Sequence, residues 1–471
     1  MHRSSERRRA LPAKDVTLVH VSTPLPCDED GRREIYLPLG CLYLVSALEG
    51  AGIDVDFRDY QMFISGNPRP LDAGCFESFL ADAAPIIAVS CMVSMLPFVI
   101  FATGRFKERH PDHALILGGP GPSGVAGEIV SSFPWIDAVG IGEGEQTLVE
   151  IVEAMKTGGD LGSVKGIVYR NETGARRTQA RQRIQNPDTI RFPAYDRIAV
   201  SDYTCIPVVT GRGCPYRCSF CDVGPLWGNR TCLRSIENVV GELDHLRSRY
   251  GIDTVHIADD TFNLKRKRAE AISDEIKGLG LNWTCLARVD LLDEDLIRRM
   301  AESGCHSLFL GIESGSDAVL ERIHKRFSIK EATEAVELSA RYMKKVVASY
   351  IWGFPFETMW DFKQTVFSVI SMWYLNARAG LKLLSPMPLS PIGIEFKAQL
   401  GYSDELCSVF ASLGNVVPGE MRRRAEIPAE LEDLILRYPE VFMGFYYIRH
   451  DGILEKARYL ENFTEKLGIR T

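Results

Sequence analysis

The stretch Gly211-Arg-Gly-Cys-Pro-Tyr-Arg-Cys-Ser-Phe-Cys-Asp222, called the cysteine loop below, carries three cysteines at the spacing C-x3-C-x2-C. They are Cys214, Cys218 and Cys221. Three thiolates on one tight loop can ligate three irons of a [4Fe–4S] cluster. Four cysteines ordinarily complete such a cluster, so this loop leaves one iron open to a small molecule. Zinc or disulfides are the alternatives. Zinc sites usually need a second pair of ligands. The flanking Cys205 and Cys232 do not have the spacing of such a pair.

The cysteine loop resembles the cluster motif of the radical S-adenosylmethionine (SAM) enzymes, including the aromatic Phe220 directly before the third cysteine. The resemblance implies that SAM chelates the open iron through its methionine amino and carboxylate groups. One electron then breaks its S–C5′ bond and gives methionine and a 5′-deoxyadenosyl radical, which abstracts hydrogen from a substrate. In such an enzyme the cofactor supplies the radical chemistry, while the protein binds and orients the reactants and excludes water.

Composition indicates an intracellular enzyme. The chain has 471 residues, a net charge of −7 and 12 scattered cysteines, which favours two or three domains and a reducing compartment over a disulfide framework. We therefore expect a cytoplasmic protein without a nucleic-acid or membrane partner. Residues 86–101 are apolar but short and interrupted by Pro97, so they predict a buried strand running into a loop.

Residues 15–157 alternate between apolar strand-like runs and helical patterns. The expected strands are 16–21, 53–57, 86–90, 114–117 and 138–141, and a helix is expected over 39–50. Continuous apolar strands separated by helices predict an α/β domain built on a doubly wound parallel sheet. Ligands bind such sheets at the carboxyl ends of the strands.

This N-terminal part resembles the cobalamin-binding, Rossmann-type domain that is fused to many radical SAM enzymes. The matching runs are Pro38-Leu-Gly40, Gly118-Gly-Pro120 and Gly142-Glu-Gly-Glu145. No D-x-H-x-x-G run is present, so the chain offers no histidine as a lower cobalt ligand. Cobalamin is thus an optional third cofactor, and the alternative is a scaffold domain that binds none.

Residues 203–388 repeat the alternation and predict a full or partial β/α barrel. Its expected strands are 204–210, 254–257, 283–286, 307–310 and 347–351, with the chemistry on the loops at their carboxyl ends. Around it we expect a disordered basic tail (1–14), a linker (158–202) and a helical C-terminal region (389–471). The aromatic run 438–447 in that region is expected to dock against the barrel.

Polar side chains follow these strands and resemble the SAM contacts of radical SAM barrels from the cobalamin-domain class. Carried over, Asp260 or Asp259 would hold the SAM amino group, and Arg288 would pair with its carboxylate through a planar fork. Glu313 and Ser314 would bind further polar groups of SAM. Capping of the following helix is the alternative for each residue alone.

The sequence leaves three functions open. Tyr216, inside the cysteine loop, could donate hydrogen or a proton to it, and the whole pattern resembles the radical SAM 1,2-diol dehydratases of aminoglycoside antibiotic biosynthesis, which act on substrates such as paromamine. A small cationic substrate would suit the acidic residues expected at the barrel mouth: Asp259, Asp260, Asp290, Glu313 and Glu357. The favoured prediction is therefore a dehydratase served by a flavodoxin- or ferredoxin-type reductant. A cobalamin-dependent C-methyltransferase and an iron–sulfur electron carrier are the alternatives.

Overall fold

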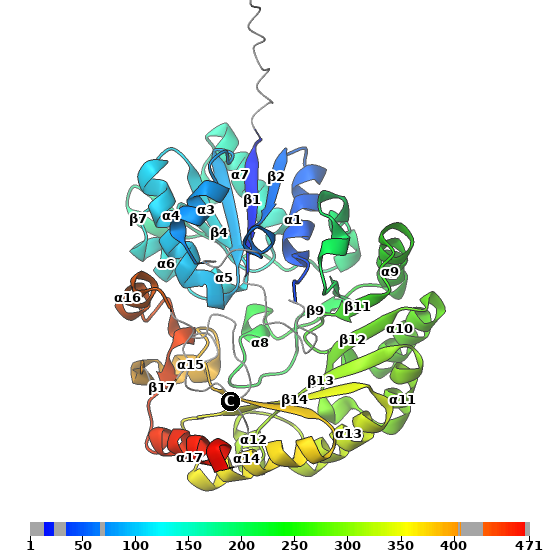
Figure 1. The fold of residues 1–471 in the computed structure, drawn as a ribbon. Helices are drawn as coiled ribbons and strands as arrows, with labels where there is room; N and C mark the ends of the chain where they lie inside the picture. The colour runs from blue at the N-terminus through cyan, green and yellow to red at the C-terminus, as the bar shows by residue number, and fades with distance from the viewer. Residues whose placement is uncertain (1–13, 23–33, 66–70, 404–405, 407–426, 467–471) are drawn as a thin grey trace, which may run out of the picture.

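The computed structural model describes residues 14–22, 34–65, 71–403, 406 and 427–466 and shows an α/β protein with two large sheets. Figure 1 shows one sheet at the N-terminal end and the second curving below it, with the short helix α8 (Val223–Leu226) between them. The basic tail predicted over residues 1–14 falls, apart from Lys14, outside the described residues.

The N-terminal sheet has seven strands in the order β2-β1-β3-β4-β5-β6-β7. Its strands are β1 (Val16–Val21), β2 (Val55–Asp59), β3 (Ile86–Cys91), β4 (Ala114–Gly118), β5 (Ala138–Gly140), β6 (Ile167–Asn171) and β7 (Gly174–Arg177). The first five are parallel, and β6 and β7 continue the sheet antiparallel. The doubly wound parallel sheet predicted from the sequence is confirmed.

Helices cover both faces of this sheet because its strands are apolar on both sides. On β1, Val16 and Leu18 join one buried cluster, and Val19 and Val21 join the opposite one. The first cluster contains α1 (Leu39–Gly50) and α7 (Gly144–Thr157); the second contains α3 (Ala73–Phe79), α4 (Leu96–Arg109) and α6 (Ala126–Ser132).

Two expectations for this half need correction. The segment 158–202 is not a plain linker, because β6 and β7 form a hairpin on the sheet edge, with Gly174 at φ +110°. The apolar segment 86–101 does not run into a loop but into α4, which tolerates Pro97 because proline fits the first helical turn. Within the described residues, no helix has both the length and the hydropathy needed to cross a bilayer.

The second sheet is a partial β/α barrel of six parallel strands in the order β15-β14-β13-β12-β11-β8. The strands are β8 (Pro207–Val208), β11 (Thr254–Ile257), β12 (Asn282–Ala287), β13 (Cys305–Glu313), β14 (Lys345–Trp352) and β15 (Arg378–Leu383). In the part of the chain that the structure describes, β8 and β15 are edges and do not pair with each other. All five predicted strands are present, and β15 is additional.

Helices line the outer side of this curved sheet (Figure 1). They are α9 (Ile236–Tyr250), α10 (Arg266–Leu279), α11 (Glu294–Glu302), α12 (Asp317–Arg322), α13 (Ile329–Tyr342) and α14 (Met359–Tyr374). A single core cluster joins the sheet to these helices and also includes Leu37, Leu42 and Tyr195 from the preceding segments. The two sheets are therefore packed against shared apolar residues.

The C-terminal region contains α15 (Pro391–Glu395), α16 (Ala429–Arg437), α17 (Ile453–Lys466) and the small strand pair β16 (Leu400–Gly401) and β17 (Tyr447–Ile448). The aromatic run 438–447 docks against the barrel only in part: Tyr447 packs against a cluster that contains Trp352 and Leu383 of the barrel, while the other aromatic residues lie elsewhere. Phe442, Phe445 and Tyr446 join the N-terminal cluster that contains α4, and the rings of Tyr438 and Phe133 lie 4.8 Å apart. The run thus covers apolar surface of the first sheet.

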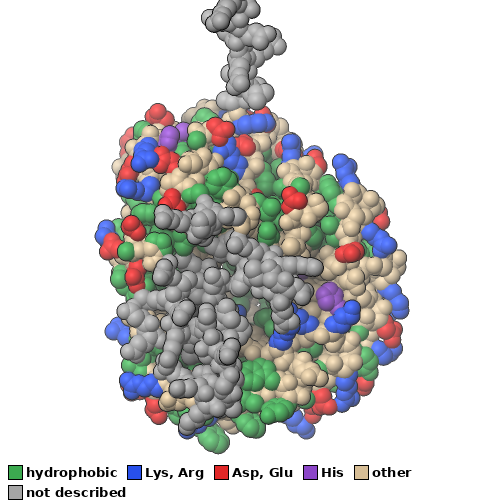
Figure 2. Space-filling model, in the orientation of Figure 1, with side chains coloured by type: hydrophobic (Ala, Val, Ile, Leu, Met, Phe, Trp, Pro, Cys, Tyr) green, Lys and Arg blue, Asp and Glu red, His purple; other side chains and the backbone are tan. Residues whose placement is uncertain are grey.

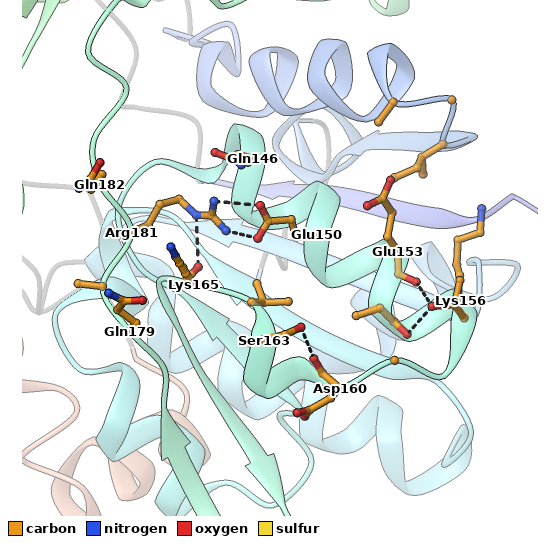
Figure 3. Close-up of a pocket in the computed structure, with 18 residues that line it drawn as sticks. Gln146, Glu150, Glu153, Lys156, Asp160, Ser163, Lys165, Gln179, Arg181 and Gln182 are labelled. Atoms are coloured by element: carbon orange, nitrogen blue, oxygen red, sulfur yellow. Dashed lines mark hydrogen bonds and ion pairs between the residues drawn. The ribbon is translucent and has the colours of Figure 1, made fainter.

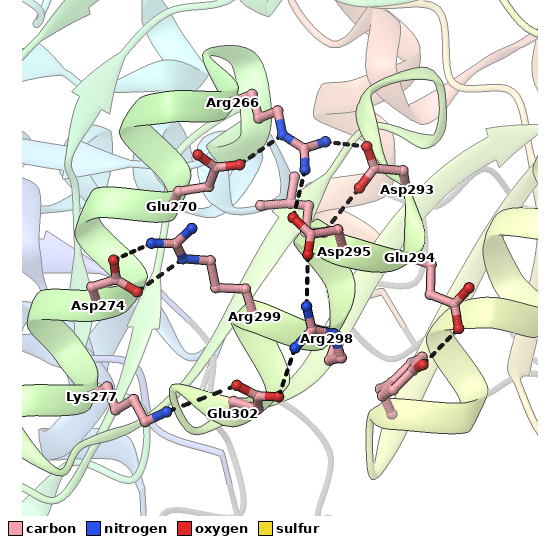
Figure 4. Close-up of polar contacts among 12 residues, drawn as sticks. Arg266, Glu270, Asp274, Lys277, Asp293, Glu294, Asp295, Arg298, Arg299 and Glu302 are labelled. Carbon is pink, nitrogen blue, oxygen red and sulfur yellow. Dashed lines mark hydrogen bonds and ion pairs between the residues drawn. The ribbon is translucent and has the colours of Figure 1, made fainter.

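Charged side chains of both signs are interspersed over the described part of the face seen in Figure 2. Between α10 and α11 they form a chain of ion pairs (Figure 4), in which Arg266 bridges Glu270 at 2.7 Å and Asp295 at 3.0 Å. Exposed pairs of this kind are screened by water and add little stability.

One buried ion pair anchors α17 to the end of β14. Lys456 Nζ donates to Glu357 Oε2 at 3.0 Å, and the two side chains are 1% and 0% exposed. Burial raises the pKa of the Glu357 carboxyl, and the neighbouring Lys456 ammonium opposes that rise.

We expect Lys456→Met to destabilise the protein, because it leaves the Glu357 carboxylate buried without its cation. Breaking a buried pair from one side lowers the free energy of unfolding by about 3 kcal/mol. Thermal or urea denaturation under anaerobic conditions measures the effect. Arg299→Met, which removes an exposed pair with Asp274 (Figure 4), is the matched control and should change little. Equal stability of the two variants would contradict the assignment.

Candidate active site

The cysteine loop leaves the barrel at the carboxyl end of β8 and runs without regular structure from residue 213 to residue 222. Just before its first cysteine, β9 (Gly211–Arg212) pairs with β10 (Cys232–Leu233). Cys214, Cys218 and Cys221 are half-buried free thiols. Backbone conformation closes the second half of the loop, where the Cys221 N–H donates to the Cys218 carbonyl at 3.1 Å.

These three thiols fit a cluster better than a single ion. Among the described residues, no three His, Cys, Asp or Glu side chains converge on one ion position. In a [4Fe–4S] cluster each thiolate binds a different iron, so its ligands stand farther apart. Burial raises the pKa of the Cys221 thiol to about 12.

Two consecutive carboxylates after β11 fix the beginning of the loop. Asp259 Oδ1 accepts from the backbone N–H groups of Thr210 at 2.6 Å and Gly211 at 3.1 Å. Its Oδ2 accepts from the Thr210 hydroxyl at 2.5 Å. Asp260 Oδ2 accepts from the Gly213 N–H at 3.0 Å. Burial raises the pKa of Asp259 to about 6, against the effect of these hydrogen bonds.

Asp259 therefore holds the loop, since both of its carboxylate oxygens accept hydrogen bonds from Thr210 or Gly211, directly before the cysteines. Of the two predicted partners of the SAM amino group, Asp260 is the better placed, because only one of its oxygens takes part in holding the loop. Its contact with SAM remains a prediction.

Arg288 lies beside the cysteine loop but is already paired. Its Nε and Nη2 donate to the two oxygens of Asp290 at 2.8 and 3.1 Å, and its guanidinium carbon lies 3.5 Å from the centre of the Tyr216 ring. The pair with Asp290 uses Nε and Nη2, one side of the guanidinium, so that Nη1 takes no part in it. Pairing of Arg288 with the SAM carboxylate remains a prediction. Burial raises the pKa of the Tyr216 phenol, so that this ring stays protonated at neutral pH.

Glu313 and Ser314 end β13 with an unusual backbone. Glu313 has φ +75°, a left-handed conformation that non-glycine residues adopt at a cost of about 1–3 kcal/mol and that clusters at functional sites. Its carboxylate accepts from Lys325 Nζ at 3.1 Å. The fully buried Ser314 hydroxyl lies 3.1 Å from the Thr365 hydroxyl of α14. Both side chains thus have protein partners, and their contacts with SAM remain predictions.

Lys325 is a site residue that sequence reasoning missed. The sequence predicts one helix over 316–326, but α12 ends at Arg322 and His324 takes φ +62°. This turn brings Lys325 Nζ to 5.8 Å from the centre of the Phe220 ring. The Phe220 ring also meets Phe354 edge-on at 6.2 Å, which places the aromatic residue of the cysteine loop against the loop after β14.

The acidic barrel mouth expected for a polycationic substrate is not free. Each of its five carboxylates has a partner within the protein. Asp259 and Asp260 accept from backbone amides at the start of the cysteine loop. The other three form ion pairs: Asp290 with Arg288, Glu313 with Lys325, and Glu357 with Lys456. Since pairing neutralises most of these charges, the structure does not supply the cation-binding surface that the sequence predicted.

A second candidate site lies above the strand ends of the N-terminal sheet. An apolar pocket there is lined by residues that include Leu18, Ile116, Gly118, Gly142 and Glu143, and no histidine is among its lining residues. A Cβ added at Gly118 or Gly142 would meet no atom within 4 Å. The glycines therefore keep space open where such sheets bind ligands, but the cavity of about 50 Å³ holds only a small apolar part of a cofactor as large as cobalamin.

We expect Cys214→Ala to abolish assembly of the cluster, because only two thiolates remain in the loop. Iron and sulfide analysis with the EPR spectrum of the reduced, anaerobically reconstituted protein measures this. Cys232→Ala, in the paired strand β10, should retain the cluster. Loss of iron from the Cys232 variant alone would contradict the ligand assignment.

Asp259→Asn should weaken the cluster loop rather than remove a ligand. An amide nitrogen cannot accept the hydrogen bonds that one carboxylate oxygen now receives, and each lost buried bond costs about 1–3 kcal/mol. The variant is expected to lose iron faster on dilution with a chelator and to melt at a lower temperature. Unchanged iron release would show that the carboxylate does not hold the loop.

Comparison with known proteins matches residues 208–369 to the Radical SAM superfamily and residues 32–152 to the B12 binding domain. An uncharacterized methyltransferase of Pyrococcus horikoshii is 32% identical over 346 residues, which is 70% of this chain and 72% of that protein. The cytidylyl-2-hydroxyethylphosphonate methyltransferase of Streptomyces wedmorensis is 27% identical over 372 residues, or 68% and 69% of the two chains.

Among solved structures, the radical SAM methyltransferase TsrM of Kitasatospora setae superposes with a TM-score of 0.71 at 20% identity, covering 96% of this chain and 88% of that one. The cobalamin-dependent SAM radical enzyme OxsB gives a TM-score of 0.67 at 17% identity, covering 96% and 67%. At these identities the likeness shows the shared fold.

Proposed function

The chain belongs to the radical SAM superfamily and carries a B12 binding domain, and from this premise we propose that it is a cobalamin-dependent C-methyltransferase. The observation that carries the proposal is the similarity to proteins named methyltransferases across most of both chains. The open pocket over the N-terminal strand ends supports it, because a methyl-carrying cofactor needs its own site beside the SAM site.

Dehydration of an aminoglycoside, which the sequence favoured, is less well supported by the site than methyl transfer. The acidic residues that would attract a polycation are paired within the protein. The Tyr216 ring is stacked on Arg288, and methyl transfer needs no hydrogen donor there. We therefore assign Tyr216 to positioning Arg288 and not to donating hydrogen to a substrate radical.

In this proposal the chain's own residues bind and orient the cluster and SAM. Cys214, Cys218 and Cys221 would hold the cluster, and Asp260 would accept from the SAM amino group. When bound, the cluster and SAM supply the 5′-deoxyadenosyl radical, and cobalamin supplies the methyl group. A low-potential flavodoxin or ferredoxin is the proposed electron donor, and a cytoplasmic location remains a prediction.

The proposed reaction replaces a substrate C–H by C–CH3. One SAM gives up its methyl group and becomes S-adenosylhomocysteine, and a second yields methionine and 5′-deoxyadenosine, which carries the abstracted hydrogen. Two electrons enter from the reductant. An iron–sulfur electron carrier would form none of these products.

The test needs no knowledge of the substrate. Reconstituted protein is supplied with hydroxocobalamin, a reductant and SAM that carries a CD3 group, and we expect the labelled methyl group on the protein-bound cobalamin by mass spectrometry. We also expect slow formation of 5′-deoxyadenosine, which the Cys214→Ala variant should not form.

A parallel incubation with paromamine distinguishes the earlier prediction. Loss of one water from paromamine, with or without cobalamin, would contradict the methyltransferase proposal in favour of dehydration. Cleavage of SAM without any label on cobalamin would also contradict it.

A further inference from the structure

We propose that Arg212 is a positioning residue that holds the pocket of the B12 binding domain and the cysteine loop at a fixed separation. The inference rests on the proposed function, since it assumes that cobalamin occupies that pocket. It concerns a group that touches neither cofactor and acts through Glu143 and Glu145.

The Arg212 side chain forks between two carboxylates of the other domain. Its Nη1 lies 3.2 Å from Glu143 Oε1, and its Nη2 lies 2.6 Å from Glu145 Oε1. The guanidinium also faces the Tyr43 ring of α1, with 5.2 Å between the guanidinium carbon and the ring centre. The three ion-paired side chains are 14%, 6% and 11% exposed. A planar fork that is largely shielded from water fixes orientation as well as distance.

The backbone on either side of Arg212 is held by the barrel. The Gly211 N–H donates to Asp259 and the Gly213 N–H donates to Asp260, at 3.1 and 3.0 Å. Arg212 therefore stands between two barrel-bound amides while its side chain reaches the N-terminal domain. It is a joint between the domains, two residues before the first cluster cysteine.

In the N-terminal domain, one of the two glutamates that pair with Arg212 is part of the pocket wall. Glu143 lines the pocket over the N-terminal strand ends together with Gly142 and Gly144. Its Oε1 faces Arg212, and its Oε2 accepts from the Ile184 N–H at 2.8 Å. A movement of Arg212 would therefore be transmitted to the wall of the pocket.

A second arginine supports the same joint from the segment between the domains. Arg183 Nη2 donates to the Arg212 carbonyl at 3.2 Å, and its Nη1 donates to the carbonyls of Trp227 and Arg230 at 3.0 and 2.9 Å. These carbonyls lie just beyond the cysteine loop. The network thus joins Arg183, the cysteine loop and the residues just after that loop. Among these contacts, the side chain of Arg212 is the one that links the loop to the pocket wall.

The two carboxylates explain why the joint depends on the cation. Without Arg212, Glu143 and Glu145 would be two like charges, partly buried and close together, and such charges repel and draw in water. Arg212→Gln should therefore loosen the pocket wall against the loop while leaving the three cysteines and their barrel contacts in place.

The test compares Arg212→Gln with wild type and with Arg181→Gln. Arg181 is a matched control because it also pairs with a glutamate of α7, Glu150, and is 11% exposed. Figure 3 shows this pair in a separate polar hollow, lined by α7 and the segments 159–165 and 179–182. The readout is the magnetic interaction between bound cob(II)alamin and the reduced cluster, seen as broadening and faster relaxation of the cob(II)alamin EPR signal.

We expect one uniform interaction in wild type and in Arg181→Gln, and a weakened, heterogeneous one in Arg212→Gln. With SAM that carries a CD3 group, the label found on bound cobalamin per 5′-deoxyadenosine should fall about tenfold in Arg212→Gln, because a small misplacement of reacting groups has effects of this size. SAM cleavage itself should persist in all three proteins. An unchanged EPR interaction in Arg212→Gln would overturn the inference.

Two further variants keep the test decisive if Arg212→Gln does not assemble a cluster. Arg212→Lys retains the charge but cannot fork, and Glu145→Gln removes one arm, so both should show a partial loss of the interaction; unchanged signals would overturn the inference. Absence of bound cob(II)alamin in wild type would overturn it together with the proposed function. A normal wild-type interaction without any CD3 label on cobalamin would count against the proposed reaction alone.

Discussion

The cysteine loop forms no helix or strand beyond the two residues of β9, so backbone amides around its start need acceptors from elsewhere. In this protein two consecutive carboxylates, Asp259 and Asp260, supply them at the end of β11. Because β8 and β11 are parallel neighbours in the sheet, their carboxyl ends meet, and the carboxylates reach the loop directly. The position of the beginning of the cysteine loop depends on this contact.

The same short stretch also determines how the two domains meet. Amides at alternate residues face the barrel, and the arginine between them faces the glycine-rich loop after β5. Apolar packing adds to this contact, since Leu37 and Leu42, between β1 and β2, and Tyr195, after the N-terminal sheet, join the barrel core. An enzyme that uses two cofactors needs both sites in one rigid arrangement, and here the link between them is polar and specific.

Much of this fold could be predicted from the sequence because the parallel strands are short, apolar and regularly spaced. Strands β1 and β11 have the predicted bounds. The missed strands β6, β7 and β15 are short or carry arginine, lysine or glycine at several positions, which weakens the apolar periodicity. Strands β7 and β15 also lie at sheet edges. The residue types of the site were predicted, but their partners were not. Nothing in the sequence shows that Asp290 occupies the Arg288 fork, or that a turn at His324 brings Lys325 to Glu313.

The central claim is that the three-cysteine loop holds a cluster whose remaining iron is open to SAM. Mössbauer spectroscopy of the 57Fe-reconstituted protein, recorded before and after addition of SAM, tests it most directly. The account predicts that SAM changes the isomer shift and quadrupole splitting of a single iron site and leaves the other three as they were. A spectrum that SAM does not alter, or one in which all four irons respond alike, would contradict it.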